Sequence, residues 1–118
     1  SPVDALEAAL AERLGPVLGP PPADGWVPSH GDLAPWNLRR TDRGVALVDW
    51  DTAAYAPRGT DAAYFAACAH AVAGRPMTPI TDGAREHLLA LPDRRSDAED
   101  VALTARLREA LSTAARRA

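Results

Sequence analysis

The chain has 118 residues, of which 47% are hydrophobic and 25% are charged, and its formal net charge is −3 at pH 7. This length fits one domain at most, residues 1–118, and the slightly acidic balance offers no basic surface for nucleic acid. Apolar runs stay well short of the roughly 20 residues of a membrane span, no signal-peptide pattern precedes the first helix, and the single Cys68 excludes an internal disulfide. We therefore expect a cytoplasmic protein.

The N-terminal segment predicts an amphipathic helix over residues 1–14, because leucines recur there at helical spacing. A Gly-Pro pair directly after it is expected to end or kink the helix. Residues 15–29 are rich in proline and glycine and predict an extended connector. Within it, Trp26-Val27 is expected to form a short strand or to plug into the core.

Two polar motifs follow the connector. The first reads H-G-D-L-A-P-W-N over residues 30–37, and the second reads V-D-W-D over residues 48–51. Transfer of a phosphoryl group from ATP to a hydroxyl needs a carboxylate that accepts the hydroxyl proton and oxygen ligands that hold magnesium. Asp32 is the candidate base, and Asn37 and Asp49 are the candidate magnesium ligands.

The residues between the two motifs predict an antiparallel β-hairpin. The sequence T-D-R-G over residues 41–44 is typical of a turn, and short strand-like runs flank it. A hairpin centred near Arg43 places Asn37 opposite Asp49, so that both ligands meet at its open end. A shift of one residue would turn the two side chains to opposite faces.

The remaining residues predict a loop over 52–59 and three helices, over about 61–74, 83–91 and 97–116. Thr60 is expected to cap the first helix, and Thr81 or Asp82 the second. A capping box over residues 96–99 opens the third. Four arginines in and after this helix are expected to form a mostly solvated face: Arg106, Arg108, Arg116 and Arg117.

Together with P-R-G-T-D-A-A over residues 57–63, the two motifs resemble the aminoglycoside phosphotransferase and choline-kinase-like family, which has a protein-kinase-like fold. The combination of H-G-D-x-x-P-x-N with a D-W-D motif is specific, whereas either half alone is weak. The kinase catalytic loop has the same separation between its aspartate and asparagine. The resemblance implies Asp32 as the catalytic base, Asn37 and Asp49 as magnesium ligands, and Asp61 as a brace of the catalytic loop.

Four further residues carry interpretations with alternatives. His30 is expected to fix the loop by packing and hydrogen bonding, and the alternative is a metal-ligand role beside Asp32. Trp36 is expected to pack against the substrate side, with substrate stacking as the alternative. Arg58 is a candidate for substrate contact or for a structural salt bridge, and Asp51 is a further metal candidate or a hydrogen-bonding partner of the loop.

The expected architecture is α+β and mainly helical: a protein-kinase-like C-terminal lobe with a catalytic loop and one short β-hairpin, without the N-terminal nucleotide lobe. The 118 residues contain no lysine and no glycine-rich phosphate loop. This chain alone is therefore expected to be incomplete and inactive. Its missing nucleotide lobe is expected as a partner in cis or in trans.

The leading hypothesis is ATP-dependent, Mg²⁺-dependent transfer of the γ-phosphate to a hydroxyl of a small molecule, either an aminoglycoside-like antibiotic or a metabolite. The alternative is a non-catalytic, truncated kinase-like module that binds a partner or forms a dimer through its exposed cleft. A third hypothesis is a metal-dependent hydrolase that uses His30, Asp32, Asp49 and Asp51.

Overall fold

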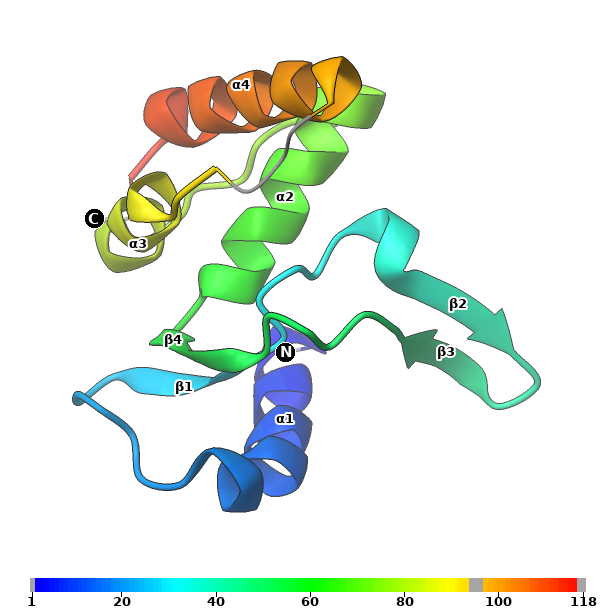
Figure 1. Cartoon of the computed structure of the whole chain (residues 1–118), viewed down its shortest axis with the longest axis vertical. Coiled ribbons are helices and arrows are strands. Elements are labelled where there is room, and N and C mark those ends of the chain that lie inside the picture. Colours follow the sequence, from blue (N-terminus) through cyan, green and yellow to red (C-terminus); the bar gives the residue numbers. More distant parts are fainter. Residues whose placement is uncertain (1, 94–96, 117–118) are drawn as a thin grey trace.

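The computed structural model describes residues 2–93 and 97–116, with the main chain alone for residues 2–4. The fold is α+β and roughly half helical (Figure 1). Its elements in chain order are α1 (Pro2–Leu18), β1 (Trp26–Ser29), the short 3₁₀ helix η1 (Pro35–Asn37), β2 (Leu38–Thr41), β3 (Gly44–Leu47), β4 (Ala54–Pro57), α2 (Thr60–Ala73), α3 (Asp82–Ala90) and α4 (Ala98–Thr113). None of the helices in this part of the chain is long and apolar enough to cross a membrane.

The strands form two separate antiparallel pairs, β1 with β4 and β2 with β3. The first pair runs from Trp26 opposite Pro57 to Ser29 opposite Ala54. The expected hairpin is confirmed as β2–β3, whereas the expectation of a loop over residues 52–59 is wrong, because Ala54–Pro57 forms β4. The second strand of this pair was hard to foresee because its sequence A-Y-A-P lacks β-branched residues and ends in proline.

The β2–β3 hairpin turns through two residues, Asp42 and Arg43, because Thr41 pairs with Gly44. The Thr41 hydroxyl oxygen accepts a hydrogen bond from the Arg43 N–H (3.2 Å), which stabilises the tight turn. The centre of the hairpin therefore lies between Asp42 and Arg43 rather than at Arg43.

This register moves the pairing at the open end of the hairpin by one residue. Val48 lies next to Asn37, and its N–H donates to the Asn37 carbonyl oxygen (3.0 Å). The expected placement of Asn37 opposite Asp49 is therefore wrong by one position. Two-residue turns and three-residue turns differ by this one step, and turn composition alone did not separate them.

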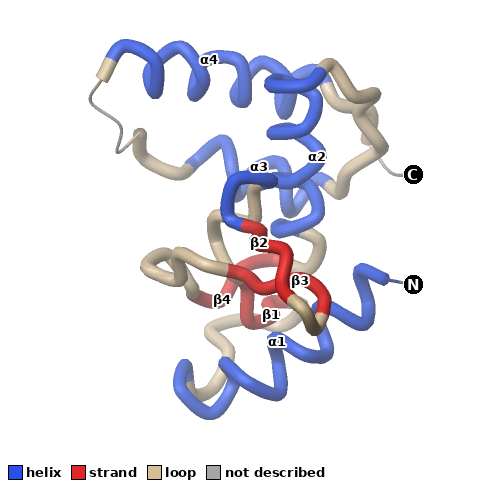
Figure 2. Tube along the Cα trace, turned by 90° about the vertical axis from the view of Figure 1, so that its right-hand side faces the viewer, coloured by secondary structure: helices blue, strands red, loops and turns tan. Residues whose placement is uncertain are grey.

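The helices α2, α3 and α4 gather around the main hydrophobic core, and α1 lies at the other end of the molecule beside β1 (Figure 2). The core is built largely from small side chains, with Cys68 fully buried on α2. Ala34, in the loop after β1, is also fully buried in this core. The β2–β3 hairpin packs chiefly on itself and projects from the body (Figure 1). The polar loop of residues 30–37 therefore lies between the helical core and the projecting hairpin.

The first helix is longer than expected. It continues through Pro16 and ends at Leu18, where Gly19 N–H donates to the Gly15 carbonyl oxygen (3.0 Å). The Tyr55 hydroxyl donates to the carbonyl oxygen of Gly19. These two contacts hold the last turn although proline removes one helical hydrogen bond.

The other three helices lie close to their expected positions, but their caps differ in part. Gly59 in the left-handed region precedes α2, and the Thr60 hydroxyl donates to the Pro57 carbonyl oxygen instead of capping the helix. Thr81 caps α3, as one of the two expected alternatives, and Asp97 caps α4 by accepting from the main-chain N–H at position 100. The expected contribution of Ser96 to a capping box lies outside the described residues.

Candidate active site

His30 is fully buried and joins the two polar motifs. Its Nε2 lies 2.8 Å from the carbonyl oxygen of Val48, and its Nδ1 lies 3.1 Å from the main-chain nitrogen of Asp32. Because a carbonyl oxygen can only accept, Nε2 carries the proton and Nδ1 accepts from the Asp32 N–H. Both ring nitrogens are therefore engaged with main-chain groups. This leaves neither nitrogen for a metal ion, and the metal-ligand alternative for His30 is not supported.

Asp61, in the first turn of α2, binds the same loop from the opposite side. Its Oδ2 accepts from His30 N–H (2.8 Å) and its Oδ1 accepts from Gly31 N–H (3.1 Å). Hydrogen bonds that involve a charged partner are stronger than neutral ones. The carboxylate therefore holds two consecutive peptide groups directly before Asp32.

Gly31 has a φ of +90°, and a Cβ atom at this position would lie 2.3 Å from the carbonyl oxygen of Thr52. A side chain is thus excluded both by the backbone conformation and by the close approach of Thr52, which directly follows the second motif. The Trp50 indole covers the His30 ring, with the ring centroids 4.6 Å apart. The first motif therefore packs directly against Trp50 of the second motif and against Thr52, which follows it.

Asp32 has two carboxylate oxygens in different environments. Oδ2 accepts a hydrogen bond from the Asn37 side-chain amide (3.0 Å), which also donates to the Asp32 carbonyl oxygen (2.8 Å). Oδ1 is buried and has no hydrogen-bond partner among the described residues. Buried polar atoms are normally paired, so an unpaired carboxylate oxygen indicates a place where a ligand donates a hydrogen bond.

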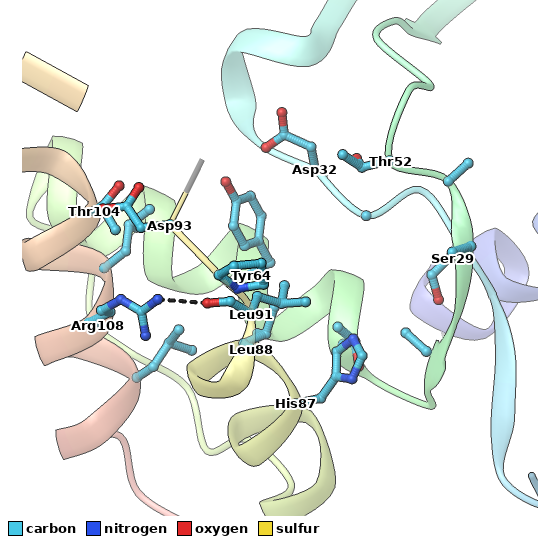
Figure 3. A pocket seen from close by; sticks show the side chains of 18 of the residues that line it. Ser29, Asp32, Thr52, Tyr64, His87, Leu88, Leu91, Asp93, Thr104 and Arg108 are labelled. Atoms are coloured by element: carbon cyan, nitrogen blue, oxygen red, sulfur yellow. Dashed lines mark hydrogen bonds between the residues drawn. The ribbon is translucent and has the colours of Figure 1, made fainter. Parts of the chain in front are cut away.

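A pocket of about 500 Å³ lies beside this carboxylate and is partly lined by it (Figure 3). Asp51 from the second motif and Thr52 directly after it line the pocket, together with Tyr64 of α2 and side chains of α3 and α4. This size is in the usual range for small-molecule sites. Asp32 therefore lies beside a space that could hold a small acceptor, and Asn37 fixes one of its two carboxylate oxygens.

Asp49 follows the paired part of the hairpin and has a φ of +62°. It is the only non-glycine residue with a positive φ in the described part of the chain. Aspartate tolerates this conformation better than most residues, but the conformation still has an energetic cost. Since β3 ends at Leu47, the alternation of side chains along a strand no longer applies at Asp49. The chain therefore changes direction at Asp49, directly after the hairpin residues whose pairing differs by one position from the expected pairing.

The oxygen atoms of Asn37 and Asp49 suit magnesium in chemical type. The Asn37 amide oxygen accepts no hydrogen bond from a described residue, and the Asp49 side chain is exposed and likewise has no such partner. Across residues 2–93 and 97–116, no group of three or more His, Cys, Asp or Glu side chains is placed to hold a metal ion. A magnesium ion at these two residues would need water and phosphate oxygens as its other ligands, which is its usual coordination in nucleotide sites.

The two substrate-side candidates lie away from this pocket. Trp36 is half-buried and packs against the hydrophobic core. Arg58 is exposed, and its guanidinium pairs with the carboxylate of Glu7 on α1. Neither residue is among those that line the pocket. The salt-bridge alternative for Arg58 is the one that the structure contains.

Several pocket residues were not foreseen as site residues, notably Tyr64, His87, Thr104 and Arg108. No local motif marks them, because they come from three helices that meet only in the folded chain. Arg108 was expected on a solvated face, yet it is half-buried and donates to main-chain carbonyl oxygens of residues 89 and 91. The expectation for Arg108 is therefore wrong.

Comparison with known proteins gives one finding. A family model described as the phosphotransferase enzyme family matches residues 2–99. The curated proteins and the solved structures give no significant match to the chain. The matched region includes both polar motifs, Asp61 and the hairpin, and it ends at the start of α4.

Proposed function

Because this chain belongs to the phosphotransferase enzyme family, we propose that it carries the catalytic base and the acceptor pocket of an ATP-dependent kinase that acts on small hydroxyl compounds. The observation that carries the proposal is the Asp32 carboxylate. One oxygen is fixed by Asn37, and the other is buried without a partner beside a pocket. This arrangement suits a group that accepts a proton from a bound hydroxyl.

In the proposed reaction, the acceptor hydroxyl in the pocket donates a hydrogen bond to Asp32 Oδ1. As the hydroxyl oxygen forms its bond to the γ-phosphorus of ATP, the bond from that phosphorus to the leaving oxygen of ADP breaks, and the hydroxyl proton passes to Asp32. His30 and Asp61 hold the main chain on which Asp32 is placed. Such transfers depend mainly on positioning and on neutralisation of phosphate charge.

Asn37 and Asp49 would hold Mg²⁺ together with the phosphates. Magnesium bound there would neutralise negative charge on the phosphate oxygens. The 118 residues contain no lysine and no glycine-rich loop for the phosphates. We therefore propose that a nucleotide-binding part, in cis or in trans, completes the site.

The charges around the pocket bear on the acceptor. Among the described residues, the carboxylates of Asp32 and Asp51 line it, while Arg108, the arginine among these lining residues, is bound to main-chain carbonyl oxygens. Anionic acceptors such as sugar phosphates would meet carboxylates at this surface. We therefore propose a neutral or cationic hydroxyl compound, which includes aminoglycoside-like antibiotics and amine-bearing metabolites.

The test is the substitution Asp32→Asn in the full-length product of the gene, assayed by ADP release with Mg²⁺, ATP and a panel of choline, an aminoglycoside, a neutral hexose and a hexose phosphate. We expect kcat to fall by at least about a hundredfold, because the amide cannot accept the proton. The shape and the hydrogen bond from Asn37 are kept, so the unfolding temperature should change little.

A matched variant is Asp51→Asn, which removes the charge of another pocket carboxylate. Asp51 is exposed, and no described side chain orients it. Its substitution should lower kcat less than Asp32→Asn does. A protein with Asn at position 32 that keeps wild-type turnover would overturn the assignment of the base.

A further inference from the structure

One wall of the pocket comes from α4, which lies almost entirely beyond residue 99, where the family match ends. Four side chains of this helix line the pocket: Thr104, Leu107, Arg108 and Leu111. Figure 3 shows Thr104 and Arg108 on the α4 side, with Tyr64 between them and Asp32. A helix that lies almost entirely beyond the family match thus lines the same pocket as the candidate base.

Arg108 connects this wall to the end of α3. One guanidinium nitrogen donates to the carbonyl oxygen of Leu89 (2.8 Å), and a second donates to that of Leu91 (2.7 Å). The last carbonyl groups of a helix have no partner within the helix, and a cation near them is favoured by the helix dipole. A planar guanidinium can satisfy two such groups at once, so Arg108 fixes both the position and the direction of this chain end.

The chain end held in this way is itself a pocket wall. Leu91, Pro92 and Asp93 follow α3 directly and all line the pocket. Pro92 restricts Leu91 to an extended conformation, so the chain leaves the helix abruptly at this point. Two hydrogen bonds from Arg108 therefore place three consecutive lining residues relative to α4.

We propose that Arg108 is a positioning residue for the acceptor: by binding the carbonyl oxygens of Leu89 and Leu91, it sets the distance between the α4 wall and the α3 end and thereby selects which acceptor fits. The proposal rests on the proposed kinase function. It assigns to Arg108 no contact with the reacting atoms. It predicts an effect on the binding of the acceptor and little effect on the nucleotide side.

The chain offers a matched control for a purely structural role. Arg85 on α3 also donates to a main-chain carbonyl oxygen of α4, that of Ser112, but it does not line the pocket. Buried apolar residues, including Leu88, Leu107 and Leu111, hold the two helices together in addition. Loss of either arginine therefore removes a link between α3 and α4, and of these two arginines Arg108 is the one that lines the pocket.

The experiment compares Arg108→Ala, Arg108→Lys and Arg85→Ala in the full-length gene product, with Mg²⁺, ATP and the acceptor from the panel above that gives the highest kcat/KM. We expect Arg108→Ala to raise the KM for that acceptor roughly tenfold, the loss that corresponds to one charge-assisted hydrogen bond. Arg108→Lys should recover part of this loss, because an ammonium can reach one of the two carbonyl groups. The KM for ATP and the slow hydrolysis of ATP without acceptor should stay within about twofold, as for changes outside the nucleotide site.

Arg85→Ala should leave the KM for the acceptor within about twofold, even if it lowers the unfolding temperature. An equal rise in this KM for Arg85→Ala and Arg108→Ala, or no rise for Arg108→Ala, would overturn the inference while transfer by the wild-type protein still supported the proposed function. Absence of transfer by the wild-type protein to every compound in the panel would overturn the proposed function, and the inference with it.

Discussion

At the residue scale, Gly31 lies where the site leaves no space for a side chain. Its neighbours His30 and Asp32 contact the second motif and Asn37, respectively, and its own N–H is bound by Asp61. The peptide of Gly31 therefore has to pass between the Asp61 carboxylate and the Thr52 carbonyl group. A glycine is required there because two segments approach each other without space for a side chain.

Substitution of Gly31 by alanine should destabilise the fold strongly. The new Cβ would meet the Thr52 carbonyl oxygen at 2.3 Å, and the φ of +90° is unfavourable for alanine. We expect the free energy of unfolding to fall by more than about 2 kcal/mol in urea denaturation. Gly25→Ala is the control, because Gly25 also has a positive φ but no atom within 4 Å of the added Cβ. That variant should lose about 1 kcal/mol, from backbone strain alone.

If both variants lost the same free energy, the close approach of Gly31 to Thr52 would not matter for stability. The comparison thus separates steric contact from backbone conformation. It also tests whether Gly31 and the Thr52 carbonyl group lie as close together as the structure has them.

The positions of single site residues could be predicted from the sequence to different degrees. The spacing of Asp32 and Asn37 placed them in one loop, and the structure joins them by a side-chain hydrogen bond. The relation of Asn37 to Asp49 depended on the length of the turn, which differs by one residue from the expectation. The conformation of Asp49 could not be predicted, because nothing in the local sequence requires a positive φ there.

At the element scale, the side chain of Glu7 connects α1 to the residues directly before α2. Glu7 Oε1 accepts from the Gly59 N–H (3.2 Å), and its other oxygen pairs with Arg58. Gly59 precedes α2, whose first turn carries Asp61. A negative charge at this helix end is favourable, so α1 supports the helix that in turn holds the loop of residues 30–37.

Glu7→Ala should lower the free energy of unfolding by about 1 kcal/mol, chiefly through the lost bond to Gly59. Arg58→Ala should have a smaller effect, because the Arg58 side chain is 65% exposed and exposed ion pairs contribute little. Glu12→Ala, at an exposed position of the same helix, should change stability hardly at all. Urea denaturation of the three variants would check this order, and an Arg58→Ala loss as large as that of Glu7→Ala would contradict it.

The helices could be predicted well because local signals determine them. Thr81 and Asp97 act as caps, and Gly74 ends α2 in the left-handed region. The β1–β4 pair could not be predicted in the same way, because its strands are distant in sequence and both contain proline. The far wall of the pocket was missed for a similar reason: α4 comes to the pocket only through the packing of three helices.

At the scale of the whole molecule, the loop of residues 30–37 separates two sides. On one side lies the pocket beside Asp32, closed by α2, α3 and α4. On the other side the β2–β3 hairpin projects from the body (Figure 1), and Asp49 follows it. An isolated two-stranded hairpin is marginally stable in water. In the proposed function, a nucleotide and the part of the protein that binds it would contact the molecule on this hairpin side.

Because the proposed nucleotide side is separate from the pocket, we predict that Mg²⁺ alone and Mg²⁺ with ATP have different effects on the unfolding temperature. Because the described residues include no acidic cluster that could hold a metal by itself, Mg²⁺ alone should leave the unfolding temperature of the full-length gene product within about 1 °C. Mg²⁺ with ATP should raise it in proportion to the affinity for the nucleotide. Asp49→Asn removes the charge of a proposed magnesium ligand and should weaken this binding by about tenfold or more, which reduces the rise in a thermal unfolding series at increasing ATP. Asp42→Asn, at another exposed aspartate in the hairpin turn, should leave the rise in unfolding temperature unchanged.

If Asp49→Asn kept the full Mg²⁺-dependent rise while Asp42→Asn reduced it, the role of Asp49 as a ligand would be wrong. The magnesium ligand would then have to be sought elsewhere on the hairpin side.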